Sequence, residues 1–146
     1  MTSSGEPDAP DAPPVRRAVV AAHGDLAAGL VSAVAQITGR GDVLVPFSNR
    51  GLGGEEIERG IREAADAHGA QVVFTDLPAG CCALGARRLL RARPDLVLVT
   101  GTNLATLLDF VFHDELPPTE AALHAAEKGR TAIQVSGLPA EARRAD

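Results

Sequence analysis

The chain has 146 residues, of which 45% are hydrophobic and 23% are charged, and this composition suits one compact domain with a sizeable core. The formal net charge of -5 argues against a nucleic-acid-binding surface, which would need a basic stripe. No apolar run reaches the roughly 18 residues of a membrane-spanning helix, and the N-terminus lacks the pattern of a secretory signal. We therefore expect a cytoplasmic protein whose partners are proteins or small molecules.

The first segment of the chain, residues 1–15, is rich in proline, acidic residues and small residues. Such a composition cannot bury enough apolar surface to offset the entropy that is lost on ordering. We expect a disordered tail there, then a single folded domain over residues 16–136. Residues 137–146 are expected to form a flexible C-terminal tail.

Short aliphatic runs alternate with amphipathic segments through the folded part. The predicted strands are Ala18 to Ala22, Val43 to Val45, Gln71 to Phe74 and Leu96 to Val99, with a short fifth strand from Thr131 to Val135. Between the runs, apolar residues recur every three or four positions, which predicts helices with one apolar stripe each. The alternation predicts an α/β domain with an open, mainly parallel sheet and helices on both faces.

Two adjacent cysteines, Cys81 and Cys82, follow the third predicted strand. Neighbouring cysteines cannot join distant segments, and their spacing does not match a zinc site. We interpret both as reduced thiols and expect neither a metal nor a cofactor.

Polar and glycine-bearing segments follow the first, third and fourth predicted strands. They begin at His23, Thr75 and Thr100, and ligand sites of open parallel sheets lie at such carboxyl ends. If the first and third strands are neighbours, His23 comes within reach of Asp76. A carboxylate that accepts a hydrogen bond from one imidazole nitrogen leaves the other nitrogen free to attack a phosphoryl group. A structural role for His23 is the competing interpretation, and spacing alone leaves both open.

Other polar residues have simpler interpretations. Asp25 and Asn103 are placed to cap the helices that follow them. His68, His113 and His124 show no partner in the sequence and are predicted to be surface residues.

Three stretches, "AHGDLAAGLVSAVAQITG", "TDLPAGCCALGARR" and "LVTGTNLATLLDF", together resemble the mannose-type enzyme IIA of the bacterial phosphoenolpyruvate-dependent sugar phosphotransferase system. The resemblance covers roughly residues 17–133. It implies a cytoplasmic phosphotransferase that accepts a phosphoryl group from phospho-HPr on His23 and passes it to a IIB component, which serves a membrane permease. It also implies that Asp76 orients His23, and that the chain forms a homodimer through its last strand.

The loop after Asp76 departs from the family pattern. Ala79, Gly80, Cys81 and Cys82 stand where the family usually has Gly-Gly-Ser-Pro, and a thiol is a weaker hydrogen-bond donor than a hydroxyl. Gly24, Gly80 and Cys81 are the candidates for holding the phosphoryl group or supporting its loop.

Three alternative functions stay open at this point. Two use the same histidine: a regulatory phosphoprotein, and the phosphoryl-donor subunit of dihydroxyacetone kinase. The third is a small-molecule-binding module in which the histidine is inert.

Overall fold

The computed structural model describes residues 17–137 and residue 139. The predicted N-terminal tail lies outside the described residues, as does most of the predicted C-terminal tail. None of the described helices is both long enough and apolar enough to cross a membrane.

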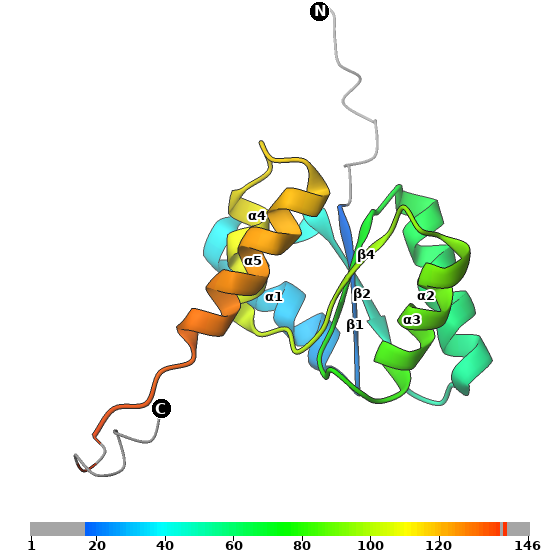
Figure 1. Cartoon of the computed structure of the whole chain (residues 1–146), viewed down its shortest axis with the longest axis horizontal. Coiled ribbons are helices and arrows are strands. Elements are labelled where there is room, and N and C mark those ends of the chain that lie inside the picture. The colour runs from blue at the N-terminus through cyan, green and yellow to red at the C-terminus, as the bar shows by residue number, and fades with distance from the viewer. Residues whose placement is uncertain (1–16, 138, 140–146) are drawn as a thin grey trace, which may run out of the picture.

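The centre of the fold is a four-stranded parallel sheet with the strand order β2-β1-β3-β4 (Figure 1). The strands are β1 (Ala18–Ala22), β2 (Leu44–Ser48), β3 (Val72–Thr75) and β4 (Val97–Val99). The predicted strands β1, β3 and β4 are confirmed to within one residue. The second predicted strand starts earlier than β2, because Gly41–Val43 form a short 3₁₀ helix instead.

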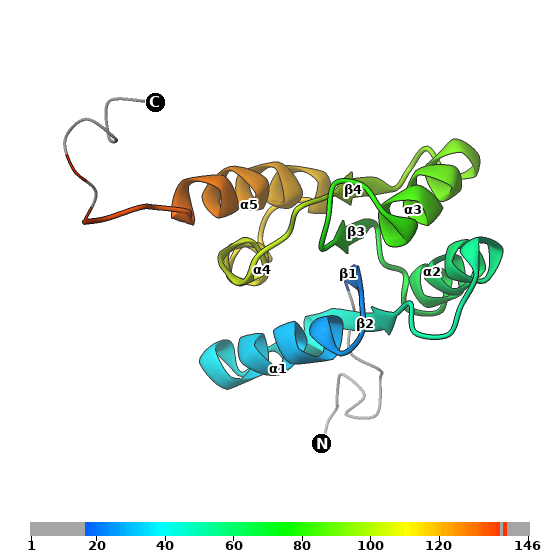
Figure 2. The ribbon, with the colours of Figure 1, turned by 90° about the horizontal axis from the view of Figure 1, so that it is seen from below.

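Helices cover both faces of the sheet, as the alternating pattern predicts (Figure 2). One face carries α1 (Leu26–Thr38), α4 (Leu104–Phe112) and α5 (Pro118–Ala132), and the other carries α2 (Gly54–His68) and α3 (Cys81–Ala92). Because both faces are covered, every residue of the central strand β1 is buried. The open, parallel α/β architecture is therefore confirmed.

The two faces of β1 divide the core into two apolar clusters. Val20 points into a cluster that contains Phe74 and Phe110, whose rings meet edge to face at a centroid distance of 5.1 Å. Val19 points into the other cluster, which contains Ile61. These alternating contacts fix the register of β1 between its neighbours, since a slip by one residue would exchange the two faces.

The edge strand β2 contains a proline, Pro46, which lies opposite Val20 of β1. Proline has no N–H for a sheet ladder, and it is tolerated in an edge strand where that side of the backbone faces outward.

The predicted fifth strand is wrong for the described chain. Thr131 and Ala132 belong to the last turn of α5, and Ile133 to Val135 are exposed and belong to no strand. The alanine-rich helix continues to Ala132 because its residues favour helix, whereas a strand needs a neighbouring strand to satisfy its backbone groups.

Candidate functional site

The site is built where the chain changes from one face of the sheet to the other. The connection from β1 to β2 passes through α1, and the next connection passes through α2 on the opposite face. The carboxyl ends of β1 and β3 therefore form the switch point at which open α/β sheets bind ligands. Since Ala21 pairs with Thr75, His23 and Asp76 emerge side by side.

Asp76 holds both the main chain and the side chain of His23. Its Oδ2 lies 2.8 Å from His23 Nδ1 and accepts a hydrogen bond of 3.0 Å from the His23 backbone N–H. The Asp76 side chain is only 9% exposed, whereas that of His23 is 45% exposed. The carboxylate thus fixes the ring orientation through Nδ1, while nearly half of the His23 side chain stays exposed to solvent. The expected juxtaposition of these two residues is present.

The charge of Asp76 is stabilised by this arrangement. Burial by itself would raise the pKa of the carboxyl, but the hydrogen bonds from the His23 side chain and backbone outweigh it, and the pKa lies below its usual value of 3.8. Among the described residues, Asp76 Oδ1 is the only buried side-chain oxygen or nitrogen without a hydrogen-bond partner. An unpaired buried carboxylate oxygen is costly and requires an explanation, of which a functional role is one.

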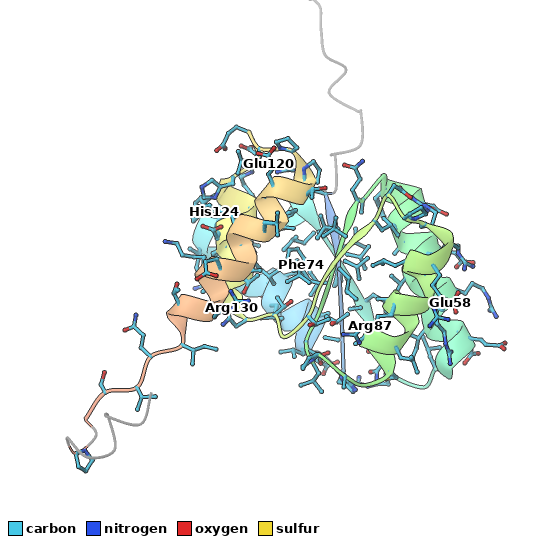
Figure 3. All side chains as sticks on the ribbon, in the orientation of Figure 1. Glu58, Phe74, Arg87, Glu120, His124 and Arg130 are labelled. Atoms are coloured by element: carbon cyan, nitrogen blue, oxygen red, sulfur yellow. The ribbon has the colours of Figure 1, made fainter. Side chains whose placement is uncertain are left out.

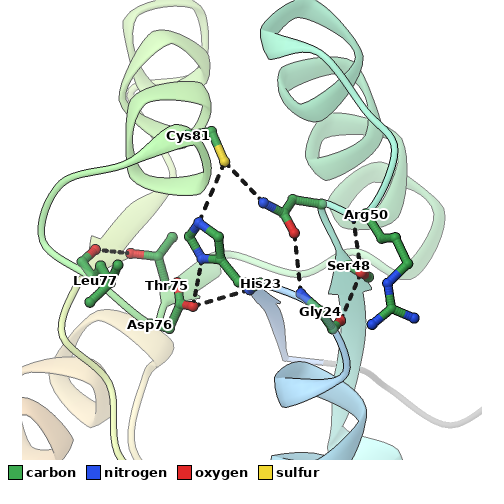
Figure 4. Close-up of polar contacts among 9 residues, drawn as sticks. His23, Gly24, Ser48, Arg50, Thr75, Asp76, Leu77 and Cys81 are labelled. Atoms are coloured by element: carbon green, nitrogen blue, oxygen red, sulfur yellow. Dashed lines mark hydrogen bonds and ion pairs between the residues drawn. The ribbon is translucent and has the colours of Figure 1, made fainter.

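The second ring nitrogen of His23 faces the start of α3 (Figure 4). His23 Nε2 lies 3.7 Å from Sγ of Cys81, the first residue of that helix. The Cys81 sulfur also accepts a hydrogen bond of 3.0 Å from Asn49 Nδ2. Nε2 is therefore the ring nitrogen that points toward the helix N-terminus, and its lone pair is free when Nδ1 carries the hydrogen toward Asp76.

Gly80 allows α3 to begin this close to the histidine. Its φ is +115°, and a Cβ at this position would lie 3.7 Å from Cε1 of His23. L side chains rarely adopt such a backbone conformation. No side chain caps α3 in the described part of the chain, so its first-turn N–H groups and its dipole favour an anion at this end.

The last residue of β2 and the loop after it contribute three residues that the sequence analysis missed. Asn49 Oδ1 accepts a hydrogen bond of 3.3 Å from the Gly24 N–H, and Ser48 Oγ donates one of 2.8 Å to the Gly24 carbonyl oxygen. Arg50 lies beside the same glycine, with Nη2 3.4 Å from where a Gly24 Cβ would stand. The signal was available, because "SNRGLGG" is a polar, glycine-rich segment directly after an aliphatic run.

Asp25 is confirmed at the start of α1, but its side chain is bonded elsewhere. Asp25 occupies the N-cap position of α1 but makes no capping hydrogen bond with its side chain. Its Oδ1 instead pairs with Arg50 Nη1 at 3.0 Å, so the first two crossover loops are joined by an exposed ion pair. Asn103 does cap α4, accepting a hydrogen bond of 2.9 Å from the Thr106 N–H.

The two cysteines are free thiols, as predicted. Burial raises the pKa of Cys82 to about 12, with Cys81 and Asp76 adding to the effect, so its thiol stays protonated and packs in the core. Cys81 is the cysteine that contacts the site.

His68 and His124 are exposed, as predicted, whereas His113 is half-buried. The sequence shows no partner for His113 or His124, but both rings contact Asp109, at a place remote from His23.

Known structures share this architecture. The mannose/sorbose-specific IIA subunit of the phosphotransferase system from Enterococcus faecalis superposes with a TM-score of 0.71 at 20% identity, covering 85% of this chain and 96% of that one. The IIA protein associated with the fucose utilisation operon of Streptococcus pneumoniae gives a TM-score of 0.68 at 22% identity over 82% and 92% of the chains. A sigma-54 interaction domain protein from Enterococcus faecalis gives 0.65 at 11% identity over 83% and 94%.

A scan against protein-family models finds no match, and no curated protein matches either. The structural similarities nevertheless show that the chain has the α/β fold of mannose-type IIA proteins of the sugar phosphotransferase system.

Proposed function

We propose that this protein is a phosphoryl carrier of the sugar phosphotransferase system, with His23 as the residue that is phosphorylated. The observation that carries the proposal is the orientation of His23, whose Nδ1 lies 2.8 Å from a buried carboxylate oxygen while Nε2 faces the N-terminus of α3. The shared fold of the IIA structures supports the same function.

The proposed reaction is an in-line transfer between two histidines. The Nε2 lone pair of neutral His23 attacks the phosphorus of phospho-HPr, the new N–P bond forms, and the bond to the donor nitrogen breaks. Asp76 accepts a hydrogen bond from the Nδ1–H of His23 and stabilises the positive charge that develops on the ring. The phosphoryl group then leaves to a IIB component by the same chemistry, so the membrane permease is reached only indirectly.

Charge stabilisation in this reaction falls to the start of α3 and to Arg50. The uncapped N–H groups of α3 can donate to the phosphoryl oxygens, which lose contact with water in the complex. Arg50, 65% exposed and paired with Asp25, is the nearby cation that can turn toward them. Cys81 occupies the place of a hydroxyl donor and gives a weaker hydrogen bond.

The decisive experiment is phosphoryl transfer in a reconstituted system. The protein is incubated with labelled phosphoenolpyruvate, enzyme I and HPr, and incorporation of label is followed with time. We expect acid-labile label on the natural protein and on His68→Ala, whose histidine is exposed at the end of α2, and no label on His23→Ala. Label that persists in His23→Ala would refute the assignment.

A regulatory phosphoprotein is the second candidate, because the same fold occurs in a sigma-54 interaction domain protein. Adding a purified IIB component to the labelled protein separates the two functions: the carrier loses its label to IIB, whereas a purely regulatory protein retains it. Transfer instead to nucleotide on a kinase subunit would indicate the dihydroxyacetone kinase alternative. The homodimer also stays a prediction, and light scattering of the purified protein tests it.

A further inference from the structure

A second cluster of chemically active side chains lies between α4 and α5. His124 Nδ1 lies 2.6 Å from Asp109 Oδ2, and His113 Nδ1 lies 3.5 Å from Asp109 Oδ1 and 2.9 Å from the Asp109 carbonyl oxygen. The two imidazole rings are 4.3 Å apart between centroids. The histidine at the end of α4 and the histidine on α5 therefore direct the same ring atom, Nδ1, at one carboxylate.

The carboxylate at the centre of this cluster is buried, and its histidines are not. The Asp109 side chain is 6% exposed, whereas those of His113 and His124 are 29% and 49% exposed. A hydrogen bond from one histidine to the carboxylate is enough to link α4 and α5. The second imidazole adds a further donor atom on the solvent side, where a small ion could enter.

The supports of the cluster hold it in place. Arg17 donates hydrogen bonds of 3.2 Å to the carbonyl oxygen of His113 and 2.6 Å to that of Leu116, which fixes the turn between α4 and α5. The Arg17 guanidinium also lies 5.3 Å from the ring centroid of Phe110, next to Asp109 in the chain. The contacts of Arg17 thus hold the C-terminal end of α4 in place on its buried side.

We propose that Asp109, His113 and His124 bind a divalent first-row transition cation such as Zn²⁺. One ligand atom from each of these residues lies within 4.8 Å of the other two. Zinc bonded at about 2.0–2.1 Å in tetrahedral geometry separates its ligand atoms by roughly 3.3 Å, so the ligand atoms need to shift relative to one another by at most about 1.5 Å. Imidazole nitrogen with one carboxylate oxygen is a donor set that suits zinc, copper and nickel.

The chemistry of binding requires only a change of tautomer. A neutral imidazole can carry its single hydrogen on Nε2, which leaves the Nδ1 lone pair for the ion. Asp109 supplies the negative charge, and the ion replaces the hydrogen bonds that the two Nδ1 atoms otherwise make. The remaining position of a tetrahedral ion faces solvent, because His124 is on the outer side of α5 (Figure 3).

This site is separate from the phosphorylation site. Arg17, which anchors the turn beside His113, immediately precedes β1, whereas His23 immediately follows it. At about 3.3 Å per residue, Ala18 and Ala22 at the two ends of β1 lie about 13 Å apart, with Arg17 and His23 beyond them in opposite directions. The proposal therefore does not depend on the function proposed for His23.

The test is equilibrium dialysis of the full-length protein against zinc, with metal content measured by elemental analysis. We expect one equivalent of zinc on the natural protein, on His68→Ala and on His23→Ala, and loss of that equivalent in His113→Ala/His124→Ala. Cobalt(II) provides a second readout, because tetrahedral coordination gives strong visible absorption that the double variant should lack.

Folding and phosphoryl transfer are controlled in the same samples. Circular dichroism and labelling of His23 should match the natural protein in the double variant, and the single variant His124→Asn, at the exposed ligand, keeps the test available if the double variant unfolds. Absence of zinc on the natural protein overturns the proposal. So does zinc that is lost in His23→Ala but retained when His113 and His124 are replaced, since the ion would then be held at the first site.

Discussion

Two of the aspartate–histidine pairs in the described part of the chain have almost the same contact distance in very different settings. At the carboxyl end of the sheet, Asp76 Oδ2 lies 2.8 Å from His23 Nδ1, and between α4 and α5, Asp109 Oδ2 lies 2.6 Å from His124 Nδ1. In both pairs a carboxylate that is nearly buried fixes the ring of a half-exposed histidine. The contact alone therefore does not define the chemistry.

The difference lies in what faces the rest of each ring. Within the described residues, Asp76 contacts a single histidine, His23. His23 Nε2 faces the uncapped start of α3, which favours an anionic group. Asp109 is shared by two imidazoles, which favours a cation. In the two proposals made above, the same kind of pair therefore serves as a nucleophile or as part of a ligand set, according to its third neighbour.

The largest effect is expected from removing the charge of each aspartate in turn. Asp76→Asn should slow the phosphorylation of His23 by roughly 10²–10⁴-fold, because the amide can hold the wrong ring tautomer and cannot stabilise the charged ring. Asp109→Asn should leave the rate unchanged and abolish zinc binding. Initial rates of labelling and dialysis measure the two responses, and equal rates for both variants would contradict the separation of the sites.

A substitution at the close contact between α4 and α5 should change the free energy of unfolding together with the properties of the second site. A Cβ on Gly129 would lie 1.8 Å from Thr106 Oγ1, and the Gly129 carbonyl oxygen accepts a hydrogen bond of 3.0 Å from Asn103 Nδ2. Gly129→Ala should therefore lower the free energy of unfolding by roughly 1–3 kcal/mol. It should also weaken zinc binding, because α5 moves relative to α4.

The matched control is Gly29→Ala in α1, where a Cβ meets nothing within 4 Å. Alanine should stabilise this helix by about 0.5–1 kcal/mol. Urea unfolding measures both variants, and a destabilised Gly29→Ala would show that the contrast does not come from the contact with Thr106.

Introducing a hydroxyl beside His23 should have a smaller effect on the rate of phosphorylation. Cys81→Ser replaces a weak donor by a stronger one, and one additional hydrogen bond of about 0.5–1.5 kcal/mol corresponds to a rate increase of roughly 2- to 12-fold. Cys81→Ala should be no faster than the natural protein. An alanine variant as fast as the serine variant would assign the gain to the loss of the thiol rather than to the hydroxyl.

The smallest expected effect is the dependence of stability on pH. Because the pKa of folded Asp76 lies below its usual 3.8, its ionisation stabilises the folded protein above about pH 4, and this contribution is lost as the pH falls through the lowered pKa. The difference in unfolding free energy between the natural protein and Asp76→Asn should shrink below about pH 4. A difference that stays constant on acidification would mean that the His23 contacts do not stabilise the charge.

The sheet and the His23–Asp76 contact were predictable because both follow from short-range patterns. Aliphatic runs mark the strands, and the rule that polar residues gather at carboxyl ends of parallel strands brings His23 to Asp76 across 53 positions of sequence. Asn49 follows the same rule, and it was missed because the segment after the second strand was not considered as part of the site.

The cluster of Asp109, His113 and His124 could not be predicted in the same way. Asp109 lies on α4 and His113 follows the end of that helix four positions later, which is a recognisable spacing. The contact with His124, however, depends on how α5 rotates and packs against α4. Close approach at Gly129, which is buried, sets that packing. The end of α5 was mispredicted for a related reason, since β-branched residues favour a strand only where a neighbour is present.

Because β2 contains Pro46, the two edge strands of the sheet differ in their ability to pair with an additional strand. An additional strand laid along β2 would meet a position that lacks a backbone hydrogen-bond donor, while β4 at the opposite edge has only Val97, Leu98 and Val99, with no proline among them. A strand added to this sheet, whether from a peptide or from another molecule, should therefore pair with β4 rather than with β2.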